Sequence, residues 1–359
     1  MELSYGTDLV QSQLRNAMST AAGGQTSMTV VEISEYGPPE NLIPGLRSRP
    51  DVAAHEVLVE VRAAGVNGPD IVQRRGHYPP PKGASDLLGL EIAGTVVEVG
   101  VDVTRWKLGD AVCALTNGGG YAEYCAVDGS HCLPKPITLD WSAAATLPET
   151  YFTVWSNIFL PGRLPADGVL LVHGGAGGIG STAIQLGATR GTKVFTTVAD
   201  DEQAEFCLSL GATRAINFRK EDFVEVVRAD TGGADVVLDI ICGDYFERNI
   251  KVCRPDAHIV QLAFNGGAKV TANLMPVMLK RLTFTGSTLR SRSDAFKTQV
   301  AEQLQSQVWP QFDRGELKPV VGETFALEDA ASAHALMESA EHRGKIVLTV
   351  DRDSRVSCR

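Results

Sequence analysis

The sequence has no apolar run that approaches the roughly 20 residues needed by a membrane-spanning helix. Its first 27 residues also lack the apolar core of a secretory signal, and Arg15 is the single basic residue among them. We therefore expect a cytoplasmic protein with no membrane partner. Residues 1–27 are expected to form a disordered extension, or alternatively a short helix docked on the body, and residues 351–359 a disordered tail.

Cysteine is scarce and poorly spaced for cross-linking, because the seven cysteines are an odd number and no two follow the Cys-x-x-Cys spacing. Neither a disulfide framework nor a four-cysteine zinc lobe is expected, so most cysteines should be small buried residues. Basic residues are outnumbered, since 33 Lys and Arg oppose 43 Asp and Glu and leave a net charge of −10. That balance argues against a nucleic acid or an anionic membrane as partner, because both need a dominant basic surface.

The pattern of the chain changes near residue 145, and its length of 359 residues favours two domains. Before that point, Val-rich stretches at 57–66 and 92–100 and two strands around a Gly-rich bend within 110–127 predict a β-rich, barrel-like domain. After it, short apolar runs alternate with amphipathic helices, which predicts an α/β domain with a parallel sheet covered on both faces.

The last part of the chain predicts three further elements. A strand is expected at 281–289, one long helix at 293–312, and a strand at 346–350 that returns to the first domain.

A Gly-rich turn follows the short apolar run at 169–173 and opens a helix. Gly175, Gly177 and Gly180 fit G-x-G-x-x-G in the strand–turn–helix context that dinucleotide binding requires. Gly175 would permit the tight turn, Gly177 the approach of a pyrophosphate, and Gly180 close packing of helix on strand. The free N–H groups of the helix N-terminus favour phosphates; a flexible turn in a non-binding domain is the alternative. The predicted cofactor contacts here are Gly175, Ala176, Gly177, Gly178, Ile179 and Gly180.

The residue that meets the adenosine ribose is expected about 20 residues beyond such a turn. Asp200 lies 20 residues after Gly180, and an acid there favours the 2′-hydroxyl of NAD over the 2′-phosphate of NADP. Asp200 also suits the N-cap of the helix that follows. The two interpretations are compatible.

Four blocks of sequence together resemble the zinc-independent quinone oxidoreductase branch of the medium-chain dehydrogenase/reductase family. The resemblance spans residues 28–350 and implies a GroES-like catalytic domain at 28–145 and 288–350, with a Rossmann doubly wound cofactor domain at 146–287. It also implies a homodimer through the strand at 281–286, whose edge would otherwise stay unpaired. The four blocks are 65–100, GGGYAEYCAV at 118–127, VHGGAGGIGSTAIQLG at 172–187 and GSTLRSRS at 286–293.

Zinc-dependent relatives have a Cys, a His and a third zinc ligand. The resemblance places Asn67, Leu90 and Glu149 at these three positions of this chain. An amide, an alkyl group and one carboxylate do not make a zinc site of the required type, so no metal is expected. Hydride transfer without zinc then needs an acceptor that is already electrophilic, such as a quinone or an α,β-unsaturated carbonyl.

The resemblance further implies that Asn67, Asp70 and Tyr78 line the cleft that faces the nicotinamide, and we predict them as the catalytic residues. Tyr78 would donate a hydrogen bond to the acceptor oxygen, unless its ring only packs in a Pro-rich loop. Asn67 is expected to orient substrate or ribose. His77 is expected to face solvent and His173 to end a strand.

The same resemblance implies which residues contact the nicotinamide half of the cofactor. Phe264 would pack on the ring or belong to the core, and Arg290 or Arg292 would reach the cofactor or a quinone carbonyl or else form an exposed ion pair. The predicted contacts are Ala263, Phe264, Ser287, Leu289 and Arg290.

The choice between NADPH and NADH rests on three positions. Family members that prefer NADPH have a small polar residue, a Lys and a Tyr where this chain has Asp200, Gln203 and Phe218, and each change removes a phosphate partner. Arg219 and Lys220 remain as nearby cations. We take these three positions as cofactor contacts and NADPH as the predicted cofactor, with NADH as the alternative.

The predicted function is NAD(P)H-dependent reduction of a quinone or enone. An enoyl-thioester reductase is one alternative, but it would need a basic entrance that this acidic sequence does not obviously offer. A dinucleotide-binding structural or regulatory protein, as the lens crystallins of this branch are, is the other. The intact glycines and the pair Asn67 and Tyr78 favour an enzyme.

Overall fold

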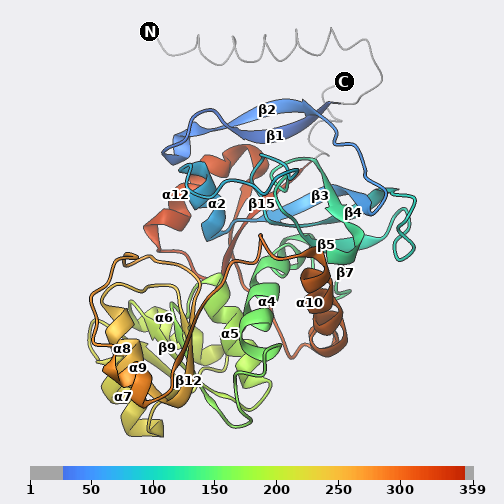
Figure 1. The fold of residues 1–359 in the computed structure, drawn as a ribbon. Coiled ribbons are helices and arrows are strands. Elements are labelled where there is room, and N and C mark those ends of the chain that lie inside the picture. The colour runs from blue at the N-terminus through green and yellow to red at the C-terminus, as the bar shows by residue number, and fades with distance from the viewer. Residues whose placement is uncertain (1–26, 352–359) are drawn as a thin grey trace, which may run out of the picture.

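The computed structural model describes residues 27–351, whose two large sheets lie in separate halves of the molecule, with a smaller two-stranded sheet beside one of them (Figure 1). The expected extension at 1–27 and tail at 351–359 fall outside these residues except for Ser27 and Asp351. Within the described residues no helix is both long and apolar enough to span a membrane. The cysteines among them are buried and unpaired, as expected.

The first sheet has seven strands in the order β14-β15-β3-β4-β5-β7, with β6 paired to β3. The two strands predicted around the Gly-rich bend are present as β5 and β6, but they pair with different neighbours rather than with each other. A hairpin of β1 (Ser27–Ile33) and β2 (Leu42–Ser48) lies beside this sheet (Figure 1). The strands are β3 (Glu56–Gly65), β4 (Glu91–Val99), β5 (Ala111–Leu115), β6 (Tyr124–Asp128), β7 (Cys132–Pro134), β14 (Val321–Ala326) and β15 (Lys345–Thr349).

The second sheet is parallel throughout, in the order β10-β9-β8-β11-β12-β13. This is the doubly wound order, in which ligands bind outside the carboxyl ends of the strands where the order reverses, between β8 and β11. The predicted α/β alternation is therefore confirmed. The strands are β8 (Val169–His173), β9 (Lys193–Val198), β10 (Arg214–Asn217), β11 (Ala234–Asp239), β12 (Cys253–Gln261) and β13 (Thr283–Gly286). The helices between them are α5 (Gly178–Ala188), α6 (Asp201–Ser209), α7 (Phe223–Thr231), α8 (Tyr245–Val252) and α9 (Met275–Leu279).

The prediction of one long helix at 293–312 is wrong. The segment forms α10 (Asp294–Gln307) and α11 (Trp309–Asp313), with Val308 between them. Pro310 explains the break, because proline has no N–H to donate and its ring clashes with the preceding turn. The strand expected at 281–289 is also shorter, since only Thr283–Gly286 are paired. The remaining helices are α2 (Gly68–Arg74), α3 (Trp141–Ala144), α4 (Pro148–Val154) and α12 (Ala330–Ser339).

The end of the chain returns to the first sheet, as predicted for residues 346–350. β15 pairs antiparallel with β3, with Val347 opposite Gly65. Just before β15, the Gly344 N–H donates to the carbonyl oxygen of Ala176 at 2.8 Å. One short segment therefore contacts both the first sheet and the turn that follows β8.

Candidate active site

The turn from β8 into α5, here called the glycine-rich turn (residues 174–180), is compact and bonded to its neighbour strand. The N–H groups of Gly174 and Gly175 both donate to the Thr197 carbonyl, at 3.2 and 3.1 Å. The residue with positive φ is Gly174 (φ 76°) rather than Gly175, so the tight turn depends on the preceding glycine. The first N–H groups of α5 have no partner inside the helix and point out of its N-terminus.

The three motif glycines are required for different reasons. A Cβ on Gly175 would lie 2.1 Å from Thr196 Oγ1, and one on Gly180 would lie 2.3 Å from the Gly174 carbonyl oxygen. At Gly177 the nearest atom is the same carbonyl oxygen at 3.7 Å, which is ordinary contact. Gly175 and Gly180 are therefore needed for packing within the protein, whereas Gly177 leaves open space that a ligand phosphate can approach.

The residues beyond β9 are organised by helix capping. Asp200 is the N-cap of α6 and accepts a hydrogen bond from the Gln203 N–H at 2.7 Å, and Gln203 Oε1 accepts one from the Ala199 N–H at 3.0 Å. The capping interpretation of Asp200 is confirmed. Phe218 follows β10 at the same carboxyl edge and is exposed. All three predicted ribose-side residues thus lie where the strands of the doubly wound sheet end.

A buried polar network surrounds Asn67, the residue just before α2, and links it to β4 and β15 of the first sheet. Lys345 Nζ donates to Asn67 Oδ1 at 2.5 Å and to the Val66 carbonyl at 2.8 Å, and it forms a 2.7 Å ion pair with Glu91. Asn67 Nδ2 in turn donates to Glu91 Oε1 at 2.9 Å. Both polar atoms of the Asn67 side chain are therefore held by protein groups.

Asp70, in the first turn of α2, is almost fully buried. Its carboxylate accepts hydrogen bonds from the N–H groups of Asn67 (2.9 Å) and Gly89 (3.0 Å), and only 1% of the residue is exposed. Burial raises the pKa of Asp70 to about 6, although the two N–H donors oppose that shift. The Asp70 carboxyl therefore holds the backbone of Asn67 and Gly89 in place.

Tyr78 and Arg290 lie side by side, and Tyr78 is the more exposed of the two. Tyr78 is half-buried, and the Arg290 guanidinium lies 5.5 Å from the centre of its ring. Arg290 is buried, donating to the Asn117 carbonyl at 2.9 Å and to Gln73 Oε1 at 2.7 Å. The exposed ion pair expected as one alternative for Arg290 is therefore wrong, because its partners are neutral acceptors.

Glu149, at the start of α4, stands at the third position where zinc-dependent relatives carry a ligand. Its N–H donates to Glu91 Oε2 at 2.8 Å, so its carboxyl group lies near a second acid. Burial and then the negative charge of Glu91 raise the pKa of Glu149 to about 8. The same carboxyl contributes to raising the pKa of Tyr78, after partial burial of the phenol. This shift favours the protonated form of Glu149 at neutral pH.

The predicted nicotinamide contacts lie together beyond the ends of β12 and β13. The Ser287 N–H donates to the Gln261 carbonyl at 3.0 Å, which aligns the two strand ends, and Gln261 Nε2 donates to the Ala263 carbonyl at 2.6 Å. Phe264 is 52% exposed, so its assignment to the core is wrong. Leu289 is buried below this edge.

The two histidines near the site lie where the sequence predicts them. His77 faces solvent. His173 is the last residue of β8, and its ring nitrogens lie 3.0 Å from Thr197 Oγ1 and 2.8 Å from Asn249 Oδ1. Burial lowers the pKa of His173, so this imidazole is a neutral part of the core.

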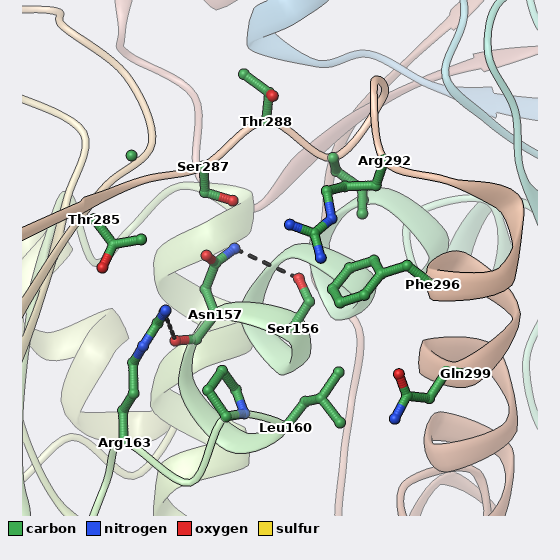
Figure 2. A pocket seen from close by; sticks show the side chains of 13 residues that line it. Ser156, Asn157, Leu160, Arg163, Thr285, Ser287, Thr288, Arg292, Phe296 and Gln299 are labelled. Carbon is green, nitrogen blue, oxygen red and sulfur yellow. Dashed lines mark hydrogen bonds between the residues drawn. The ribbon is translucent and has the colours of Figure 1, made fainter.

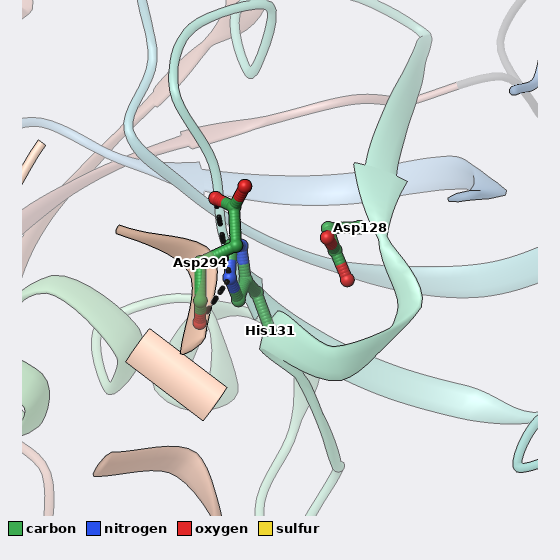
Figure 3. Close-up of side chains that lie close together, drawn as sticks. All are labelled: Asp128, His131 and Asp294. Carbon is green, nitrogen blue, oxygen red and sulfur yellow. Dashed lines mark hydrogen bonds and ion pairs between the residues drawn. The ribbon is translucent and has the colours of Figure 1, made fainter. Parts of the chain in front are cut away.

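A separate cluster of ligand-type side chains, Asp128, His131 and Asp294, ties the first sheet to α10 (Figure 3). Asp128 Oδ1 already accepts from the backbone and side chain of Ser130, at 2.8 and 2.6 Å. His131 Nε2 lies 3.4 Å from the Asp294 carbonyl and 3.8 Å from its carboxylate. These interactions explain why the three side chains lie together: they connect the first sheet to α10.

Sequence reasoning missed several members of the site. Glu91 and Lys345 carry no motif of their own, and Lys345 reaches Val66 across 279 positions of sequence. Gln73 and Asn117, which hold Arg290, follow no spacing rule either. The available signal was indirect: Glu91 adjoins Leu90, one of the positions at which zinc-dependent relatives carry a ligand.

Comparisons with known proteins agree with this architecture. A family model described as alcohol dehydrogenase GroES-like domain matches residues 53–137, and one described as zinc-binding dehydrogenase matches residues 178–306. In sequence the chain is similar to the quinone oxidoreductase of Rattus norvegicus, with 30% identity over 334 residues that cover 91% of this chain and 99% of the relative.

Two solved structures extend the similarity to the fold. The Escherichia coli quinone oxidoreductase complexed with NADPH has a TM-score of 0.80 and 28% identity, covering 89% of this chain and 99% of that one. CurK enoyl reductase has a TM-score of 0.79 and 28% identity, covering 90% and 99%. Together with the sequence relative, these likenesses confirm the GroES-like and Rossmann halves expected from the sequence. The chain therefore belongs to the medium-chain dehydrogenase/reductase family, in its quinone oxidoreductase branch.

Proposed function

We propose that this oxidoreductase uses NADPH to transfer hydride to a quinone or an α,β-unsaturated carbonyl, without zinc. The observation that carries the proposal is the unbroken series of contacts from the glycine-rich turn through Gly344 and Lys345 to Asn67. A dinucleotide on the turn would therefore lie beside the cluster of Tyr78, Glu149 and Arg290. Similarity to quinone oxidoreductases over nearly their whole length supports the same class of reaction.

The turn suits a dinucleotide because Gly177 leaves its approach open, while the N-terminus of α5 offers unpaired N–H groups to the pyrophosphate. A bound NADPH would supply the hydride. On the nicotinamide side, Ala263, Phe264, Ser287 and Leu289 are the proposed contacts. Their position beyond β12 and β13 is the edge at which doubly wound sheets bind ligands.

The preference for NADPH over NADH is supported by the engagement of Asp200 and by a similar structure that is complexed with NADPH. Lys220 pairs with Asp201 at 2.5 Å, and Arg343 pairs with Glu202, so two cations lie at the N-terminus of α6. Asp200 is engaged by its own helix, which reduces its availability to a ribose hydroxyl. The bacterial quinone oxidoreductase of the same fold is complexed with NADPH.

The donor set supports chemistry without zinc. Asn67 Oδ1 is already occupied by the Lys345 ammonium, a fixed positive charge that would repel a cation, and Leu90 offers no donor atom. Zinc sites need three or four Cys, His or carboxylate ligands around one point. The carboxyl of Glu149 alone does not meet that requirement.

The remaining residues have separate roles in the reduction. When hydride reaches the acceptor, negative charge develops on its oxygen, and the Arg290 guanidinium beside Tyr78 stabilises that charge. The Tyr78 hydroxyl donates a hydrogen bond to the same oxygen, and the protonated Glu149 carboxyl delivers the proton. Asn67 and Asp70 position the cleft wall through their hydrogen bonds.

A homodimer is proposed through β13, the end strand of its sheet among the described residues. Phe284 on this strand and a group of residues on and beside α9 are apolar and exposed, which is unfavourable in water unless a second copy covers them. The members near α9 are Leu274, Met275, Met278 and Leu279.

The function is tested by steady-state kinetics with both cofactors and three acceptors. We expect NADPH to be used with a higher kcat/KM than NADH, a small o-quinone and an enone to be reduced, and a trans-2-enoyl thioester to be poor. Turnover should survive dialysis against a strong zinc chelator. Preference for the thioester would favour the enoyl reductase alternative, loss of turnover with the chelator would refute the zinc-free mechanism, and no turnover with any acceptor would favour a binding protein.

The cofactor site is tested with Gly177→Val. Because this position has room for a side chain but lies where the pyrophosphate approaches, we expect an unchanged melting temperature and NADPH affinity at least about 100-fold weaker in a fluorescence titration. Gly180→Val is the comparison, since its Cβ meets backbone atoms and should lower stability instead. Normal NADPH affinity in Gly177→Val would contradict the assignment.

The role of Glu149 is tested by the pH profile of kcat/KM with a quinone. Because the pKa is raised to about 8, the acid is protonated and active below that pH, and the rate should fall as the pH rises through it. Glu149→Gln should lower the rate about 100-fold or more and remove that limb of the profile. A limb that persists in the variant belongs to another group.

The dimer is tested by light scattering after size exclusion. Met278→Glu places a charge on a residue that is 70% exposed, so it should yield monomers without loss of fold. Val101→Glu, at a residue 90% exposed in the other domain, is the control and should leave a dimer. A monomeric wild-type protein would refute the proposal.

A further inference from the structure

A cavity of about 360 Å³ lies outside the cluster around Asn67 and Tyr78. It is bounded by the π-helical turn η3 (Trp155–Phe159) that continues α4, by the end of β13, and by the start of α10 (Figure 2). Its size falls at the lower end of the range for small-molecule sites. The lining contains thirteen residues, among them Arg163 and Arg292 but no Asp or Glu.

The two arginines approach the cavity from different elements. Arg163 comes from the loop after η3 and donates to the Asn157 carbonyl at 2.7 Å. The Arg292 guanidinium lies 3.8 Å from the ring centre of Phe296. Figure 2 shows both guanidinium groups directed toward Asn157, from opposite sides. Neither forms a salt bridge with any residue in the described part of the chain.

Two cations without an acid are unusual in a chain with a net charge of −10, in which carboxylates outnumber basic groups. Partial burial lowers the pKa of Arg163, which reflects the cost of removing its charge from water. An anion in the cavity would offset that cost for Arg163 and would also pair with the more exposed Arg292. Planar guanidinium groups also match the oxygen geometry of phosphate.

The rest of the lining suits an organic molecule rather than a bare ion. Ser287 and Gln299 add polar groups to the lining, while Leu160, Pro161 and Phe296 supply apolar surface. We propose that this cavity binds the phosphate group of a small organic phosphate, with the organic part lying on the apolar residues. This site does not include the glycine-rich turn, although Ser287 and Leu289 belong both to its lining and to the proposed nicotinamide contacts.

The proposal is tested by calorimetric titration of the full-length protein without cofactor, at constant ionic strength. The probes are inorganic phosphate, 4′-phosphopantetheine and pantetheine, which separate the phosphate from the organic part. We expect 4′-phosphopantetheine to bind more tightly than inorganic phosphate, and pantetheine not to bind. Arg163→Gln and Arg292→Gln should each weaken binding about tenfold or more.

Three control variants distinguish binding in this cavity from binding at the glycine-rich turn and from a purely structural role of the arginines. Arg105→Gln removes a guanidinium that lies outside the cavity, 4.9 Å from the ring centre of Trp106. This variant should leave binding unchanged. Gly177→Val should also leave it unchanged, because the pyrophosphate approach is elsewhere. Arg292→Lys keeps the charge and should retain more affinity than Arg292→Gln.

Three results would overturn the proposal. One is failure of the wild-type protein to bind either phosphorylated probe, as expected if a second copy of the chain fills the cavity. Another is a phosphate bound elsewhere, at the glycine-rich turn. Full binding by both arginine-to-glutamine variants, or loss of binding in Gly177→Val, would show this. The third is equal loss in Arg292→Lys and Arg292→Gln with altered melting temperatures, which would make Arg292 structural.

Discussion

The site depends on keeping one buried ammonium group satisfied. Lys345 is almost fully buried, and an ammonium in that position costs several kcal/mol unless it is paired and hydrogen-bonded. Its three donors meet three oxygens, on Val66, Asn67 and Glu91. Because Lys345 begins β15 while its partners belong to segments near β3 and β4, this requirement fixes the end of the chain against the catalytic cleft.

The same side chain also explains a glycine that the dinucleotide motif does not require. A Cβ on Gly178 would lie 2.4 Å from Lys345 Cδ. Gly178 therefore makes room for the lysine stem. The glycine-rich turn leaves open space on the side of Gly177 and packs against Lys345 on the side of Gly178.

The elements of the fold were predictable because their signals are local. Apolar runs of strand length, glycines at turns and amphipathic helices each require only neighbouring residues, and only Pro310 was overlooked as a helix breaker. The glycine-rich turn and the N-cap at Asp200 were found for the same reason. Asp70 was placed in the cleft by resemblance, whereas its burial depends on the distant Gly89 N–H. The partners of Arg290 and Lys345 were missed because contacts across more than a hundred positions leave no pattern in one sequence.

The pairing of β15 with β3 has a consequence for the order of folding during synthesis. All six strands of the doubly wound sheet lie between residues 169 and 286, so that sheet can close once this stretch has left the ribosome. The first sheet begins earlier, yet the last part of the β3 edge, at Ala63–Gly65, stays open until residues 345–349 emerge. For most of translation, the half made first is the half that remains incomplete, with an apolar strand edge that chaperones could recognise.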